Sequence, residues 1–188
     1  MLDTDDLVLA VLQASDGVVV GRTRLQKLVY LASQALRTDC GYRPHYYGPY
    51  SSEVASTVDS QVSRRVLAEM PESFGVGSPQ FPGHDGEMRR YTYALTPDGR
   101  GAVEWHRQRH GEEFDVAVGL IQCLLASGAD WKVLCYAAKL YHILKAEGSS
   151  MTYTAAQQRA QELGWEMKPE EIAEGVRLLS EVRLVEAV

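Results

Sequence analysis

A strongly periodic helix, followed by a stretch that no helix can include, constrains this fold more than any other feature of the sequence. Apolar side chains recur every three or four positions, as on one face of an amphipathic helix, at Leu25, Leu28, Val29, Ala32 and Leu36. Residues 40–50 contain two prolines and two glycines and cannot continue this helix. We therefore expect a helix that follows an N-cap at Thr23, and then an ordered, aromatic-rich loop.

Two further helices are expected in the first part of the chain. Residues 3–15 place an apolar stripe behind acidic residues in the first turn, where the helix dipole favours negative charge. Valines recur every four residues over residues 54–66, after an N-cap at Ser51. Residues 18–20 indicate a brief connector, whereas residues 71–88, with three prolines and four glycines, indicate a loop or hairpin tip.

A strand and a return helix follow that loop. Apolar and polar residues alternate over residues 89–95, which is typical of a half-buried strand. The triplet Thr96-Pro97-Asp98 then supplies an N-cap, a proline at the first helical position and an acidic residue in the first turn. We therefore expect a helix from Thr96 toward His110.

The second part of the chain predicts further helices that end in a strand. Helical patterns cover residues 114–126, 130–148 and 168–181, and residues 182–188 are expected to form a strand. A short helix is expected to begin at Thr152 or Thr154 and to end at Gly164. This order of elements predicts a mainly α protein with a small β wing, winged-helix-like, and built from two packed winged-helix or helix-turn-helix units. We expect the first unit over residues 1–110, with its wing at about 67–96, and the second over residues 111–188.

Composition and charge narrow the class of protein. The 188 residues are 45% hydrophobic and 23% charged, as in ordinary globular domains. The acidic N-terminus lacks the basic, apolar pattern of a signal peptide, no apolar run has the length of a membrane span, and the three cysteines form no CxxC pair. We therefore expect a cytoplasmic protein with buried thiols and no membrane partner. The formal net charge of −6 hides a local excess of four positive charges over residues 21–65.

Two short motifs carry a resemblance to known proteins. Leu25 to Leu28 read LQKL in the periodic helix, and Tyr47 to Pro49 form an aromatic-Gly-Pro loop that opens the next helix. With this spacing, the chain resembles YwgA-like proteins and, more distantly, the Panacea (SocA-like) antitoxin domain. The resemblance implies a helical, winged-helix-like, non-catalytic protein of the kind often found at toxin-antitoxin or defence loci.

The first functional hypothesis is a DNA-binding winged-helix regulator of transcription. Its recognition helix would begin at Ser51 and its wing would touch phosphate, with a homodimer offsetting the modest positive charge. The residues expected at base edges are Ser52, Ser56, Ser60 and Gln61. The residues expected at phosphates are Arg22, Arg24, Lys27, Arg43, Arg64, Arg65, Arg89 and Arg90. The alternative for the helix is an ordinary solvated face.

The second hypothesis is an antitoxin-like or defence-associated protein-interaction module. Tyr46, Tyr47 and Tyr50 would contact the partner, because tyrosines are enriched at interfaces, and the acidic second half would favour a basic partner. The alternative is that these rings fill the core and fix the loop.

Catalytic and metal sites are not expected. His106 and His110 have the i, i+4 spacing of two metal ligands, but no third ligand is evident in the sequence, so a solvated polar helix end is predicted instead. No nucleophile elbow, phosphate-binding loop or dinucleotide-binding fingerprint is present. We therefore expect no enzyme activity, no cofactor and no catalytic residue.

Overall fold

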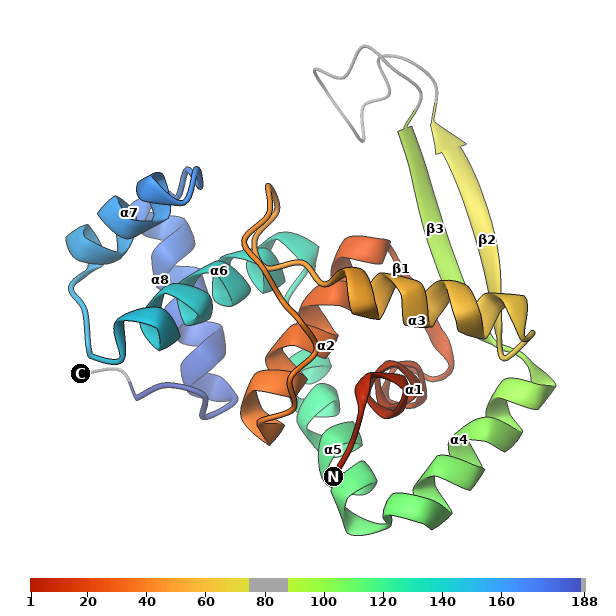
Figure 1. Ribbon diagram of the computed structural model, residues 1–188. Helices are drawn as coiled ribbons and strands as arrows, with labels where there is room; N and C mark the ends of the chain where they lie inside the picture. Colours follow the sequence, from red (N-terminus) through yellow and green to blue (C-terminus); the bar gives the residue numbers. More distant parts are fainter. Residues whose placement is uncertain (75–87, 187–188) are drawn as a thin grey trace.

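The protein is mainly helical, with one small antiparallel sheet (Figure 1). The computed structural model describes residues 1–74 and 88–186. Its elements in chain order are α1 (Thr4–Ala14), β1 (Val18–Val20), α2 (Arg22–Leu36), α3 (Ser52–Ser63), β2 (Leu67–Phe74), β3 (Met88–Leu95), α4 (Pro97–His110), α5 (Glu112–Ala126), α6 (Trp131–Glu147), α7 (Tyr153–Glu162) and α8 (Pro169–Glu181). The prediction of a mainly α protein with a small β part is confirmed.

Side-chain caps begin four of the eight predicted helices at residues that the sequence indicated. In each case the side-chain oxygen accepts a hydrogen bond from a first-turn amide, and the capping residues are Ser51, Thr96, Asp130 and Thr152. The expected cap at Thr23 is wrong. Helix α2 begins at Arg22, and its N-cap is Gly21, whose φ of 99° only glycine adopts readily.

The sheet contains one strand that the sequence did not indicate. Strand β3 lies in the centre, paired antiparallel with β1 on one side and β2 on the other. Residues 18–20, expected to be a connector, form β1, and Val19 is its one buried residue. Three residues are too few to show an alternating pattern. The β2–β3 hairpin stands away from the helices in Figure 1, and part of the expected loop over 71–88 is strand. Residues 75–87 lie outside the described residues.

A single hydrophobic core joins the two predicted units. Helix α1 lies at its centre, and its side chains from Leu7 to Leu12 are almost fully buried. Helix α5 packs against α1 and α2, and α6 packs against α2. Phe114 and Ile121, from the second predicted unit, therefore belong to the same core as Leu7. No separate core forms on either side of the expected boundary at residue 110 within the described residues.

The last helices pack on the side of the molecule opposite α4 (Figure 1). Helix α8 lies close against α6 at Gly175, where an added Cβ would be 3.2 Å from the amide nitrogen of Ala137. The strand expected over residues 182–188 is not found as far as Glu186, the last described residue. Among the described helices, none alone is long and apolar enough to cross a membrane; α5 and α6 meet that test only as a pair bent by 119°.

Candidate functional site

The two motifs of the sequence resemblance meet in space, and together they shape the loop over residues 40–50. Gln26, on α2, makes a reciprocal pair with the backbone of Ser51: its Nε2 donates to the carbonyl at 2.9 Å, and its Oε1 accepts from the amide at 3.1 Å. Lys27 Nζ donates to the carbonyl oxygen of Pro49 at 2.6 Å. Side chains of the LQKL helix therefore hold the backbone of the Gly-Pro loop at the start of α3.

The same loop is also held from the second half of the chain. Trp165, between α7 and α8, donates its indole N–H to the carbonyl of His45 at 2.6 Å. Gly48 lies directly on α6: its φ is 92°, and an added Cβ would be 2.9 Å from Cγ of Lys139. Three separate parts of the fold thus fix this loop, which we call the clamped loop (residues 40–50).

Aromatic side chains project from the clamped loop into solvent. Tyr46 is 73% exposed, and the exposed fractions of Tyr47 and of Trp131, at the start of α6, are both 41%. The rings of Tyr46 and Tyr47 meet edge to face with centroids 4.8 Å apart, and Tyr47 and Trp131 do so at 6.4 Å. Tyr50 is 39% exposed and lies beside His45. We call these exposed rings the aromatic surface: Tyr46, Tyr47, Tyr50 and Trp131.

The positions of the tyrosines distinguish the two hypotheses for this loop, which were contact with a partner and filling of the core. Tyr42 packs against Tyr30 with ring centroids 4.8 Å apart, and its hydroxyl donates to the carbonyl of Gln26, so it is the ring that anchors the loop. Tyr46 and Tyr47 are not core residues, contrary to the core-filling alternative. Trp131 was not singled out in the sequence. It lies more than eighty residues away from the loop, and only the packing of α6 brings it there.

The base of the clamped loop contains a buried amine. Lys27 is only 2% exposed, and burial lowers the pKa of its ammonium to about 8. The charge of nearby Lys139 lowers it further, whereas Cys135 opposes the shift. Burial also raises the pKa of the Cys135 thiol. A buried lysine is costly to ionise, so Lys27 serves to hold the Pro49 carbonyl and does not offer charge to solvent.

Of the residues expected at base edges on α3, some are exposed and one is buried. Ser52, Ser56 and Ser60 are exposed on α3, as the DNA hypothesis requires. Gln61 is not, because it is 1% exposed and donates to Asp5 Oδ1 at 2.9 Å. Lys27, also expected at DNA, is buried as described above. Neither residue can reach a phosphate or a base edge from its present position.

The charges around α3 are distributed unevenly. The helix itself has no Lys or Arg, and its exposed positions include Glu53 and Asp59. Arg64 and Arg65 are exposed immediately after its last turn, and Arg43 is exposed in the clamped loop. Positive charge therefore flanks α3 but does not lie on it.

Several of the expected phosphate contacts take part in the sheet. Arg22 donates from Nε to the Tyr93 hydroxyl at 2.7 Å, pairs with Glu69 at 3.1 Å, and lies over the ring of Tyr91. Arg90 pairs with Glu72 across the hairpin at 2.5 Å. Further residues expected at phosphates are at least partly accessible, namely Arg24 and Arg89. These arginines add positive charge beside the hairpin, although Arg22 and Arg90 are already paired with glutamates.

The histidine pair on α4 is enclosed rather than solvated, which corrects the expected polar helix end. The side chains of His106 and His110 are only 11% and 12% exposed. Both face Asp6, on α1, which is 1% exposed. Of the neighbouring arginines, Arg107 pairs with Asp115 and Arg109 lies over the Trp105 ring. The third group, missing from the sequence argument, comes from a helix one hundred residues away.

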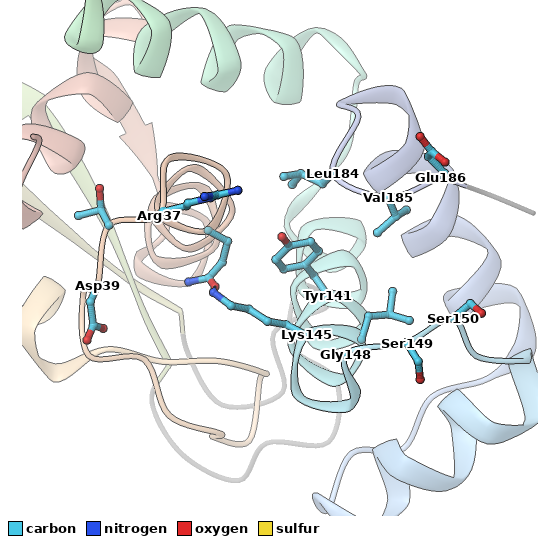
Figure 2. A pocket seen from close by; sticks show the side chains of 13 residues that line it. Arg37, Asp39, Tyr141, Lys145, Gly148, Ser149, Ser150, Leu184, Val185 and Glu186 are labelled. Atoms are coloured by element: carbon cyan, nitrogen blue, oxygen red, sulfur yellow. The ribbon is translucent and has the colours of Figure 1, made fainter.

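A separate groove of about 960 Å³ lies between the end of α2 and the end of α6. Figure 2 shows Tyr141 and Lys145, on α6, facing the region of Arg37, with Leu184 and Val185 across the opening. Lys145 donates to Gln34 Oε1 on α2. The wall of this groove is thus built from both halves of the chain, as is the core.

The chain matches none of the protein-family models compared with it, and no curated protein matches it significantly. The resemblance to YwgA-like proteins remains a prediction from the two motifs.

Proposed function

We propose that this chain is a non-enzymatic protein-interaction module that binds a protein partner through the aromatic surface. The observation that carries the proposal is the combination of exposed rings with a loop held from three sides. Tyr46 and Tyr47 are exposed, yet Lys27, Trp165 and the close contact at Gly48 fix the backbone beneath them.

Rigid, exposed aromatic side chains favour association for two reasons. Tyrosine and tryptophan bury a large area when they enter a partner, and they are the residues most enriched at binding hot spots. A backbone that is already ordered loses little conformational entropy on binding, so more of the contact energy appears as affinity. The excess of five negative charges over residues 111–188, with seven Lys and Arg against twelve Asp and Glu, supports a partner with a basic surface.

Replacing Tyr46 and Tyr47 with serine tests this function. We expect the double variant to bind the partner at least about tenfold more weakly, because two hot-spot rings are lost, while the fold is unchanged. Candidate partners are the products of neighbouring genes, purified and titrated by calorimetry. The matched control is Tyr153→Ser, which removes a tyrosine that is 52% exposed on α7 and lies outside the aromatic surface. Equal affinity of the double variant and the control for a bound partner would contradict the proposal.

A second candidate function, DNA binding, is favoured by the order of elements. Helix, strand, two helices and a two-stranded hairpin follow one another from α1 to β3, with the sheet order β1-β3-β2. This is the arrangement expected of a winged helix, with α3 as the recognition helix and the β2–β3 hairpin as the wing. The serines of α3 and the flanking arginines support contact with DNA, whereas Glu53 and Asp59 oppose it, so affinity would depend on a homodimer.

Removing the two arginines after α3 tests this second candidate. We expect Arg64→Gln with Arg65→Asn to weaken binding to random duplex DNA and to reduce the slope of log affinity against log salt by about 1 to 2. Asparagine is chosen at residue 65 because the φ there is 61°, which asparagine tolerates. Fluorescence anisotropy at several salt concentrations measures both quantities. The control, Arg159→Gln with Arg177→Gln, removes the same charge from α7 and α8; an identical effect in both pairs would show that no site at α3 exists.

A further inference from the structure

Helix α4 buries few of its side chains. Among the residues of α4, only Gly99, Val103 and His106 are buried, so the helix makes few apolar contacts. Gly99 and Val103 lie in its first half, beside the sheet. Toward its end, α4 contacts α1 through His106 and His110, which face Asp6. A polar cluster thus occupies a place where helices usually meet through apolar side chains.

Three possible metal-ligand atoms converge in this cluster. Asp6 Oδ1 lies 2.5 Å from Nδ1 of His106 and 3.2 Å from Nε2 of His110. The candidate ligand atoms of the three residues all lie within 4.8 Å of one another. In tetrahedral zinc sites with ordinary bond lengths, ligand atoms lie about 3.3 Å apart. The separation of Asp6 Oδ1 from His110 Nε2 is already close to this value, and the separation from His106 Nδ1 is shorter by about 0.8 Å.

The ring of His106 lies between two carboxylates. Its Nδ1 faces Asp6, and its Nε2 faces Asp5 Oδ2 at 3.4 Å, so both ring nitrogens point at carboxylates. A neutral imidazole donates from one nitrogen only, which leaves the lone pair of the other against a carboxylate oxygen. A metal cation bound by Nδ1 and by Asp6 would remove this repulsion.

The remaining contacts match the outer shell of a metal site. Metal-bound histidines usually donate their other N–H to a carboxylate, which fixes the ring and its tautomer. Asp5 is placed to accept from His106 in this way, and its Oδ1 is itself held by Gln61 Nε2 at 2.9 Å. Asp6 is also supported, because its Oδ2 accepts the backbone N–H of Asp3 at 2.7 Å. Gln61 was expected to contact DNA. Its burial is instead explained by the hydrogen bond that it donates to Asp5.

We propose that Asp6, His106 and His110 bind one divalent transition-metal ion, and that this ion fastens α4 to α1. Two imidazole nitrogens and one carboxylate oxygen are a donor set that suits Zn²⁺, with a fourth position for water. The two carboxylates, Asp5 and Asp6, balance the charge of the ion. All three ligands are enclosed, and an ion that binds only the folded state would stabilise it.

Calorimetric titration of the chelator-treated, full-length protein with ZnCl₂ tests the site. We expect one ion per chain and a rise in the melting temperature on zinc addition, measured by circular dichroism. Cobalt(II) added instead of zinc should give the intense visible absorption of a tetrahedral centre. Absence of zinc binding by the folded wild-type protein would overturn the proposal.

Variants locate the ion. His110→Asn removes a ligand and should weaken zinc binding more than about 100-fold, and Asp5→Asn, which touches only the outer shell, should weaken it about 10- to 100-fold. His142→Asn, on α6, is the matched control and should bind zinc as the wild type does. The circular dichroism spectrum without metal establishes that each variant is folded. Zinc affinity unchanged in His110→Asn, or lost equally in His142→Asn, would place the ion elsewhere and overturn the site.

Discussion

Replacing Gly99 with alanine is expected to destabilise the protein by about 3 kcal/mol, because the new methyl group has no room. An added Cβ would lie 2.1 Å from the carbonyl oxygen of Val66 and 3.1 Å from Cδ2 of Leu95. The carbonyl cannot move away freely, since it accepts hydrogen bonds from the backbone N–H and the hydroxyl of Thr96. Helix α4 would have to shift from the end of α3 and from the sheet.

Gly101→Ala is the matched control on the same helix. An added Cβ there has no atom within 4 Å, so the substitution should stabilise α4 by up to about 1 kcal/mol through the higher helix propensity of alanine. Urea denaturation of both variants, followed by circular dichroism, measures the free energies of unfolding. If Gly99→Ala were as stable as Gly101→Ala, the close packing of α4 against Val66 would be refuted.

Replacing Lys27 with methionine is expected to change the pH dependence of stability. Burial lowers the pKa of Lys27 from 10.5 to about 8 in the folded protein. Between these values the unfolded chain holds the proton and the folded chain has lost it, so stability rises with pH. From pH 8 to pH 9.5, the wild type should gain about 1.5 kcal/mol relative to Lys27→Met. Methionine fills a similar volume without an ionisable group.

The comparison between variants isolates this effect from the other titrating groups. Burial raises the pKa of the thiols of Cys40 and Cys135, and these groups oppose the trend because they favour the unfolded state as pH rises. They are present in both proteins and cancel to a first approximation. The control is Lys145→Met, at an exposed lysine of α6, whose stability should run parallel to the wild type. A constant difference in stability between wild type and Lys27→Met over this pH range would show that burial does not lower the pKa of Lys27.

Local patterns predicted most of the helices and their starts. Ser51, Thr96 and Asp130 each cap a helix in the structure, because a cap needs only residues two or three positions away. Errors arose where pairing is distant. Val18–Val20 form a strand through hydrogen bonds to residues 92–94, which lie more than seventy positions later.

The candidate sites depended on tertiary packing more than the helices did. The sequence predicted Tyr46 and Tyr47 as partner contacts, with core packing as the alternative, and both side chains are exposed. It also counted Lys27 among the phosphate contacts, although this residue is buried beneath the clamped loop. The positive charge of Lys27 alone suggested that it lies on the DNA-binding surface. The structure shows instead that Lys27 donates a hydrogen bond to the carbonyl oxygen of Pro49.

Sequence alone determined the helical character, most of the helix starts and the aromatic composition of the loop, since these follow from interactions within one turn or one short segment. Tertiary structure decided which of those side chains are exposed to solvent and can contact a partner. It enclosed Lys27 and exposed Tyr46, and it joined α1 to α4 by placing Asp6 against His106. The physical reason is that burial and charge pairing depend on groups that can be one hundred residues apart. A local sequence pattern does not predict which of these groups become neighbours.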